Sequence, residues 1–105
     1  MHPLFDLSNR VALVTGGSKG LGKAMARVFA EAGADVFIAS RHENELQAAL
    51  PEITAGTSAK GAFAVADLSR RGSADQLVQA AIDALGRVDI LVNNAGSNLL
   101  ESIDE

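Results

Sequence analysis

An apolar run that opens into glycines lies near the start of the chain and reads Val11-Ala12-Leu13-Val14-Thr15-Gly16-Gly17-Ser18-Lys19-Gly20-Leu21-Gly22. Apolar residues at helical spacing follow it, so the pattern predicts a short strand, a tight turn and a helix. At such a turn, free N–H groups and the positive end of the helix dipole favour an anion, and glycines let a phosphate approach the backbone. The alternative is a plain structural turn, but the strand-turn-helix context favours the pyrophosphate of a dinucleotide.

The composition fits one globular domain. The 105 residues are enough for one hydrophobic core but not for two domains, and 48% of them are apolar. A formal net charge of −4 argues against a general nucleic-acid surface. The sequence has no cysteine, and its only histidines are His2 and His42, so we expect neither a disulfide nor a metal site.

Targeting signals are missing from the sequence. The first residues lack the basic and apolar regions of a signal peptide, and no apolar run approaches the length of a membrane span. We therefore expect a cytoplasmic protein that binds no membrane.

Strand and helix patterns alternate along the chain without a linker. We expect buried strands at 11–14, 36–39, 61–66 and 88–92. Between the first two strands, helical spacing relates Leu21, Met25, Val28, Phe29 and Ala32. Gly33 is a natural stop for this first helix.

Two further helices separate the later strands. The second is expected over 43–50, where Pro51 ends or bends it. The third begins near Ser73, which has capping-box spacing to Gln76, and its apolar stripe ends at Gly86.

The alternation predicts the fold class. Strands separated by helices pair in parallel with right-handed crossovers, so the helices lie on both faces of an open sheet. The usual nucleotide-binding order of four such strands is 3-2-1-4, which is half of a doubly wound, Rossmann-like α/β fold. A ligand would then lie over the carboxyl ends of the first and fourth strands, and every candidate motif falls at that edge.

Basic residues follow the glycines and the second strand. Ser40-Arg41 stands near the position where an NAD-binding chain places a carboxylate for the ribose 2′-hydroxyl. A guanidinium offers bidentate donors to a 2′-phosphate instead, and Lys19 adds a second positive charge. The alternative is that Arg41 and Lys19 are ordinary solvated charges.

Polar residues also follow the third and fourth strands. Asp67 is placed to accept a hydrogen bond from an adenine amino group, with Leu68 against the ring; alternatively Asp67 is only a turn residue. Asn93-Asn94-Ala95-Gly96 would tie strand ends together and line a ligand, although Asn93 is as well explained by a structural role. His42 is interpreted as a solvated residue at a helix start.

These motifs together resemble the N-terminal half of a classical short-chain dehydrogenase/reductase, from about Leu7 to Gly96. The local sequence is also similar to that of gluconate 5-dehydrogenase-like and other sugar or polyol reductases within the family. The resemblance implies that Gly16, Gly20 and Gly22 carry the pyrophosphate turn, that Asp67 and Leu68 form the adenine pocket, and that residues 94–96 lie under the cofactor. The complete set of expected cofactor-binding residues is Thr15, Gly16, Ser18, Lys19, Gly20, Leu21, Gly22, Ser40, Arg41, Asp67, Leu68, Asn94, Ala95 and Gly96.

The resemblance also implies a cofactor preference. Family members that prefer NADP carry basic residues where Lys19 and Arg41 stand, whereas members that prefer NAD have an acidic residue where Ser40 stands. The expected cofactor is therefore NADP rather than NAD.

The catalytic residues of the family are not among these 105 residues. Members use a Tyr-x-x-x-Lys pair on a later helix, a serine before it and an asparagine after the fourth strand. This sequence has no tyrosine, and its last lysine is Lys60. We expect a single truncated dinucleotide-binding domain over 1–105 with no catalytic residue of its own.

The fourth strand would be interior in the complete fold, so residues 90–92 are expected to form an apolar edge. We expect a homodimer or higher oligomer, joined through this edge or by exchange of the last elements of the chain. Three functions remain open at this point. The chain is an NADP(H)-binding unit with little or no turnover, a minimal oligomeric NADP(H)-dependent oxidoreductase that acts by proximity, or a structural remnant that only oligomerises.

Overall fold

The computed structural model describes residues 6–94, which form one parallel sheet of four strands and three helices. The strand order is β3-β2-β1-β4, which confirms the predicted topology. The strands are β1 (Val11–Thr15), β2 (Asp35–Ser40), β3 (Gly61–Val65) and β4 (Ile90–Asn93), and the helices are α1 (Gly20–Glu31), α2 (Glu43–Thr54) and α3 (Ser73–Leu85).

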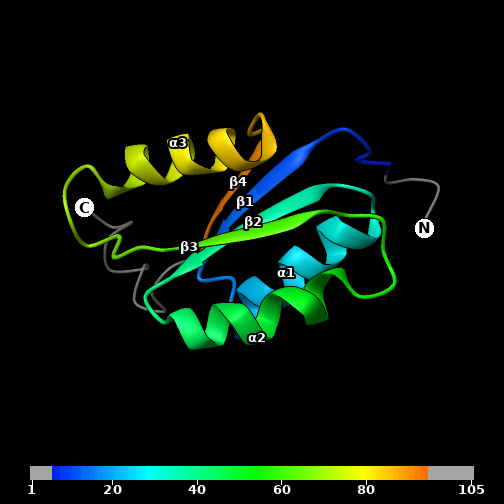
Figure 1. The fold of residues 1–105 in the computed structure, drawn as a ribbon, viewed down its shortest axis with the longest axis horizontal. Helices are drawn as coiled ribbons and strands as arrows, with labels where there is room; N and C mark the ends of the chain where they lie inside the picture. The colour runs from blue at the N-terminus through cyan, green and yellow to red at the C-terminus, as the bar shows by residue number, and fades with distance from the viewer. Residues whose placement is uncertain (1–5, 95–105) are drawn as a thin grey trace.

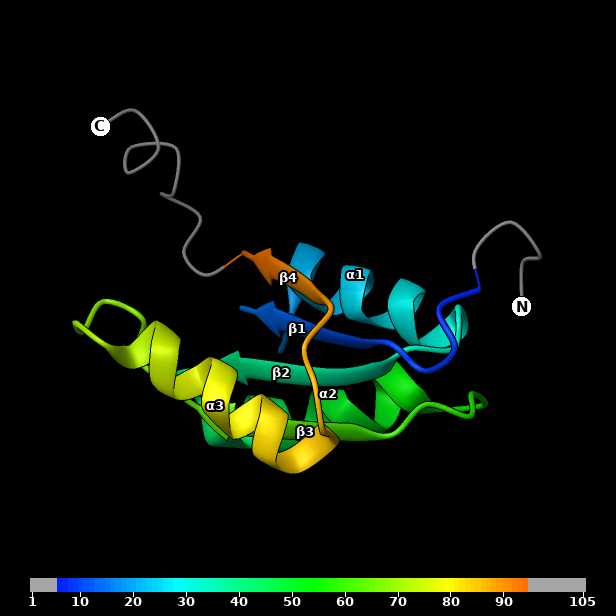
Figure 2. The same ribbon diagram turned by 90° about the horizontal axis from the view of Figure 1, so that it is seen from above.

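The helices lie on both faces of the sheet, as expected: α1 and α2 cover one face, and α3 covers the other (Figure 1). Because side chains alternate along a strand, β1 serves both cores. Val14 packs with Ile38 and the residues of α1 and α2, whereas Leu13 packs with Phe37 and α3. Figure 2 shows that α3 lies mainly over β3 and β2, so that β1 and β4 are largely uncovered on that side.

The apolar stripe that predicted α1 is only partly buried, since Phe29 packs against the core and Ala32 is buried while other members are exposed. Leu21 and Val28 are 67% and 61% exposed, whereas the buried face consists of Gly22, Ala26 and Ala30. Small residues let the helix backbone approach the strands closely, and Leu21 and Val28 are left on the outer flank. The periodicity identified the helix correctly but not the side by which it packs.

At two places, the end of α2 and the start of α3, the structure differs from what the local sequence predicted. Helix α2 continues past Pro51 to Thr54, where the Thr54 hydroxyl donates to the Leu50 carbonyl (3.1 Å). Burial of Ile53 in the core stabilises this last turn in spite of the missing proline N–H. The capping box of α3 does not form: Gly72 is the N-cap, and the Ser73 hydroxyl donates to the Arg70 carbonyl (2.7 Å).

Arg27 joins α1 to the end of α2. Its Nη1 donates to the carbonyls of Glu52, Ile53 and Ala55 at 3.3, 3.0 and 2.6 Å, and its Nε pairs with Glu31 (2.9 Å). The last carbonyls of a helix have no partners within the helix, and a cation there also opposes the negative end of the dipole. Arg27 therefore caps α2 from a neighbouring element.

Replacing Arg27 by methionine keeps much of the aliphatic stem and removes the cap. We expect the free energy of unfolding to fall by about 1 to 2 kcal/mol, because charge-assisted hydrogen bonds to the helix end are lost. Urea unfolding followed by circular dichroism measures the change. Glu31→Gln is the control, since it removes only the exposed ion pair and should cost less than about 0.5 kcal/mol; equal losses in both variants would contradict the cap.

Asp89 closes the amino-terminal end of the β1–β4 pair. Its Oδ2 accepts the Val11 N–H (2.9 Å), its Oδ1 accepts from the Arg87 guanidinium (2.8 Å), and Arg10 lies 3.7 Å away. The hydrogen bond from Arg87, followed by that from Val11, holds the pKa of this carboxyl below its usual value, and the charges of Arg87 and Arg10 act in the same direction.

A lowered pKa in the folded state means that the Asp89 carboxylate stabilises the fold above its ordinary pKa, and that this contribution disappears as the pH falls through the folded-state pKa. We therefore expect Asp89→Asn to be less stable than the unaltered chain at pH 7, with a difference that narrows toward acid pH. Urea unfolding at stepped pH tests this, with Asp83→Asn on α3 as the control for a lost surface charge. A difference that stays constant with pH would show that ionisation of Asp89 contributes nothing.

No helix within residues 6–94 is long and apolar enough to cross a membrane.

Candidate functional site

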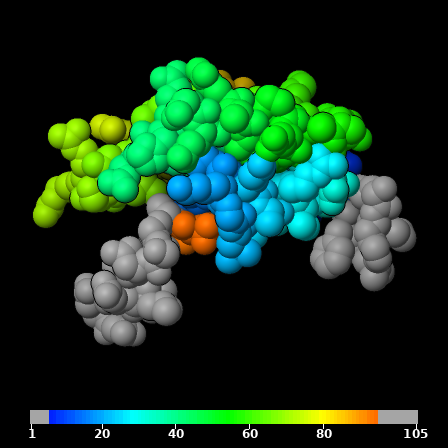
Figure 3. Space-filling view, turned by 90° about the horizontal axis from the view of Figure 1, so that it is seen from below, coloured from blue at the N-terminus to red at the C-terminus, as the bar shows by residue number. Residues whose placement is uncertain are grey.

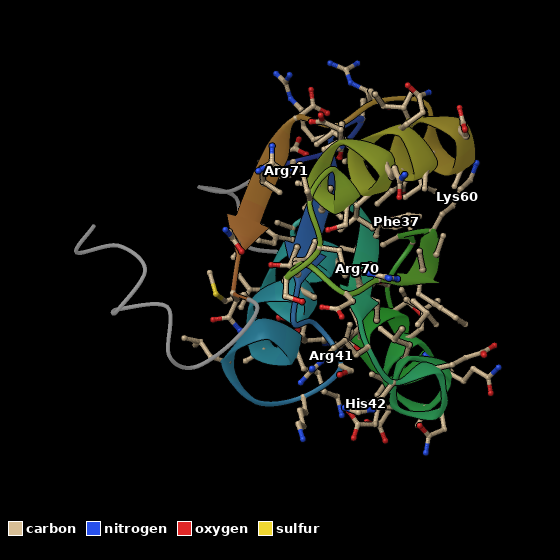
Figure 4. The ribbon with its side chains drawn as sticks, turned by 90° about the vertical axis from the view of Figure 1, so that its left-hand side faces the viewer. Phe37, Arg41, His42, Lys60, Arg70 and Arg71 are labelled. Carbon is tan, nitrogen blue, oxygen red and sulfur yellow. The ribbon has the colours of Figure 1, made fainter. Side chains whose placement is uncertain are left out.

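The carboxyl ends of the four parallel strands meet at one edge of the sheet, and Figure 4 is viewed toward this edge. In register, Thr15 at the end of β1 pairs with Ala39 in β2 and with Asn93 in β4. The loops that leave these strand ends carry the predicted site residues. The structure therefore brings the glycine turn, Arg41, Asp67 and Asn94 to the same side of the molecule.

The glycine turn is anchored to β2. The Gly16 N–H donates to the Ala39 carbonyl (2.7 Å), which fixes the point where the chain leaves β1. Gly16 and Gly20 have φ values of +67° and +62°, in the left-handed region that side chains disfavour. These two positions explain why glycine is required at the start of the turn and at the start of α1.

Gly22 is required for a different reason. A Cβ atom there would lie 2.1 Å from the Gly16 carbonyl oxygen and 2.7 Å from Nδ2 of Asn94. The first turn of α1 therefore packs directly on the backbone that leaves β1, with the Asn94 amide against it. This contact places Asn94 beside the glycine turn, as predicted.

The N-terminus of α1 has no side-chain cap. Lys19 is the N-cap residue in an extended conformation, and the first turn of α1 contains no acidic residue. The first N–H groups of a helix lack partners within the helix, so they are available to an anion at this edge. Leu21 lies in the same turn and is largely exposed.

Thr15 joins the ends of β1 and β4. Its buried hydroxyl is 3.2 Å from the Val92 carbonyl and 3.1 Å from Oδ1 of Asn93, and it accepts the Asn94 N–H at 2.8 Å. These contacts support the structural reading of Asn93 and give Thr15 a structural role as well. Ala95 and Gly96, also expected at the site, lie outside the described residues.

Ser40 and Arg41 follow β2, as predicted. The Ser40 hydroxyl accepts the N–H of His42 (3.3 Å), and His42 is the exposed N-cap of α2, which agrees with its interpretation as a helix-start residue. Arg41 is exposed, and within residues 6–94 it forms neither a hydrogen bond nor an ion pair. Its guanidinium is therefore available to a ligand.

Asp67 begins the loop after β3. Its Oδ1 accepts from the Ser69 N–H (3.0 Å) and hydroxyl (2.6 Å), so it is a turn residue, while Oδ2 is left to a ligand. These two hydrogen bonds are the main reason why the pKa of Asp67 is lowered, and the positive charges of Arg41 and Arg70 add to them. The carboxylate lines a hollow of about 370 Å³ with Arg70 and Arg71, whereas Leu68 packs on the core beneath α3.

The sequence reading missed Glu45 and Arg70. Glu45, in the first turn of α2, accepts a hydrogen bond from the Ser18 hydroxyl (3.3 Å) and lies 3.9 Å from the Lys19 ammonium. One signal could have indicated it: α1 and α2 begin after neighbouring parallel strands, so their first turns must meet at the same edge. Arg70 acts electrostatically on Asp67 and follows it by one turn, with its N–H bonded to the Asp67 carbonyl (3.1 Å).

Other kinds of site find little support in the part of the chain that the structure describes. No group of three or more histidine, aspartate or glutamate residues there is placed to hold a metal ion. A second hollow, of about 300 Å³, lies between α2 and the amino-terminal end of β3, where Leu50, Thr54 and Gly61 line it. It is therefore separate from the edge that carries the predicted site residues.

Comparison with known proteins agrees with this architecture. A family model described as short chain dehydrogenase matches residues 10–105. A 3-oxoacyl-[acyl-carrier-protein] reductase of rhamnolipid biosynthesis from Pseudomonas aeruginosa is 44% identical over 99 residues, which cover 93% of this chain and 38% of the relative. The chain thus spans well under half the length of that curated relative.

Solved structures show the same fold. The RhlG/NADP active-site complex of Pseudomonas aeruginosa aligns with a TM-score of 0.81 at 40% identity, covering 99% of this chain and 41% of that one. L-Sorbose reductase from Gluconobacter frateurii, complexed with NADPH and L-sorbose, aligns with a TM-score of 0.82 at 31% identity, covering 89% and 35%. Since the family model spans nearly the whole chain and these structures share its fold, the chain belongs to the short chain dehydrogenase family.

Proposed function

We propose that this chain is an NADP(H)-binding unit, and that these 105 residues alone bind the cofactor with little or no turnover. The observation that carries the proposal is that Arg41 lies at the same edge as the uncapped N-terminus of α1. Among residues 6–94, Arg41 has no ion-pair or hydrogen-bond partner. The N-terminus of α1 suits a pyrophosphate, and the Arg41 guanidinium suits a 2′-phosphate.

The preference for NADP over NAD rests on charge at the end of β2. A carboxylate at Ser40 would accept hydrogen bonds from a ribose 2′-hydroxyl and would repel a phosphate there. Ser40 is uncharged, its hydroxyl accepts the His42 N–H, and the neighbouring cation is Arg41. Two of the similar structures contain NADP or NADPH, which supports the same choice for this chain.

Asp67, Asn94 and the residues of the glycine turn would contact the rest of such a cofactor. Asp67 would accept the adenine amino group through Oδ2, since its Oδ1 is held by Ser69. Asn94 would contact the cofactor next to Gly22, against which its amide packs. Ser18 and Lys19 would line the turn, with Thr15 holding the strand ends beneath it.

The expectation of little turnover rests on the lack of a tyrosine that could act as the general acid. A hydride transferred to a carbonyl leaves an alkoxide, and a positioned general acid speeds this step by about 10²- to 10⁴-fold. The sequence contains no tyrosine that could act as such an acid. Binding is therefore the proposed function of the 105-residue chain.

Calorimetric titration tests the proposal. The unaltered chain is expected to bind NADPH more tightly than NADH. Arg41→Ala should weaken NADPH binding by about tenfold or more, because charge-assisted hydrogen bonds to the phosphate are lost, and should change NADH binding by less than about threefold.

Lys60→Ala is the matched control. It removes one exposed positive charge at the amino-terminal end of β3, away from Arg41, and should change neither affinity (Figure 4). Equal losses for both cofactors in Arg41→Ala would contradict the 2′-phosphate role, and no heat with either cofactor would favour a structural remnant. NADPH oxidation with ketone substrates that is abolished by Gly20→Asp would favour a minimal oxidoreductase instead.

The apolar edge at β4 supports a second part of the proposal, a homodimer or higher oligomer. Within residues 6–94, β4 pairs only with β1, and its Leu91 is 58% exposed. Figure 3 shows β4 at the surface beside α1. An exposed apolar edge strand readily pairs with another chain, so a second copy of β4 is the proposed partner.

Sedimentation velocity at micromolar concentration should give a dimer or larger species for the unaltered chain. Leu91→Lys should shift it to monomer, because charged residues on an edge oppose strand pairing. Val65→Lys places the same charge on β3 at the opposite edge and should leave the assembly intact. A monomeric unaltered chain would rule out this mode of association.

Two other expectations stay predictions. They are the single dinucleotide-binding domain over 1–105 and the cytoplasmic location.

A further inference from the structure

Glu45 is the acidic side chain in contact with the glycine turn. Its Oε1 accepts a hydrogen bond from the Ser18 hydroxyl at 3.3 Å, and its Oε2 lies 3.9 Å from Nζ of Lys19. Ser18 is buried, whereas the Lys19 side chain is 77% exposed. One carboxylate therefore holds a buried hydroxyl of the turn and pairs with its exposed cation.

The position of Glu45 in the fold brings its charge to the phosphate-binding edge. It belongs to the first turn of α2, two residues after the start of that helix and close behind Arg41. The positive end of the α2 dipole stabilises a carboxylate there. Arg41 itself forms no ion pair with Glu45. The cation that Glu45 pairs with at this edge is Lys19.

We propose that Glu45 sets how strongly this chain distinguishes a dinucleotide with a 2′-phosphate from one without it. Its carboxylate fixes the turn through Ser18 and competes with the 2′-phosphate for Lys19. This inference rests on the proposed NADP(H) binding and adds an opposing charge to it.

The two cofactors meet Glu45 differently. A 2′-phosphate that approaches Arg41 and Lys19 carries close to two negative charges, and it either displaces Glu45 from Lys19 or binds in the field of the carboxylate. A dinucleotide with a free 2′-hydroxyl brings no charge to this point. Glu45 therefore weakens the binding of NADPH and has little effect on NADH through charge, while the hydrogen bond to Ser18 serves both.

Glu45→Gln separates charge from hydrogen bonding, because the amide oxygen can still accept from Ser18. We expect NADPH to bind about threefold more tightly to this variant and NADH to bind unchanged, since one exposed charge-charge contact is removed. Calorimetric titration of both cofactors at about 0.05 M and about 0.5 M salt measures the effect. The gain should shrink at the higher salt, where exposed charges are screened over a shorter distance.

Glu52→Gln is the matched control. It removes the same charge from the same helix, and Glu52 pairs with Lys23 in α1 near the other end of α2. Its NADPH affinity should equal that of the unaltered chain. Thermal unfolding of both variants verifies that they are folded.

Glu45→Ala tests the second role. It removes the acceptor of Ser18 along with the charge, so NADH should bind more weakly to it than to Glu45→Gln. Unchanged or weaker NADPH binding by Glu45→Gln, in a chain that binds NADPH normally, would overturn this inference alone. Absence of NADPH binding by the unaltered chain would overturn the proposed function and this inference together.

Discussion

The contact between the first turn of α1 and the backbone that leaves β1 is the constraint on which the carboxyl edge depends. At Gly22 a Cβ atom would lie 2.1 Å from the Gly16 carbonyl oxygen, so the helix can start at this place only if the residue is glycine. The same contact brings the uncapped end of α1 beside Asn94 and turns Ser18 toward Glu45. A larger residue at Gly22 would push α1 outward and would separate these groups together.

Charges at this edge alternate rather than accumulate. Lys19 faces Glu45, and Asp67 lies in the field of both Arg41 and Arg70. Exposed pairs of this kind add little to stability, typically under about 1 kcal/mol each. In the proposed binding of NADP(H), their effect would fall on recognition instead, because a phosphate near Arg41 and Lys19 would compete with Glu45 for Lys19. The proposed preference for a phosphorylated ligand would then be a balance between the attraction of Arg41 and Lys19 and the repulsion of Glu45.

The sequence sufficed for the strand order and for the convergence of the glycine turn, Arg41, Asp67 and Asn94 at one edge, because both follow from alternation and parallel pairing. It did not identify the buried face of α1, since Leu21 and Val28 are as regularly spaced as Gly22, Ala26 and Ala30. Which of the two stripes packs on the sheet depends on how closely the helix approaches, and that is a property of three-dimensional packing. Glu45 was missed because its partners, Ser18 and Lys19, belong to another loop.

Burial changes across the sheet in a way that bears on binding. The residues of β1 and the centre of β2 are almost fully buried, whereas Leu91 of β4 and Val28 on the flank of α1 are exposed. The turn and Arg41, which follow β1 and β2, are thus carried by the well-packed part of the sheet, and Asn94 follows the less covered part. A molecule that covers β4 would stabilise the position of Asn94 against Gly22. Because binding equilibria that share a conformation are reciprocal, association at β4 and occupation of the glycine turn should then strengthen each other.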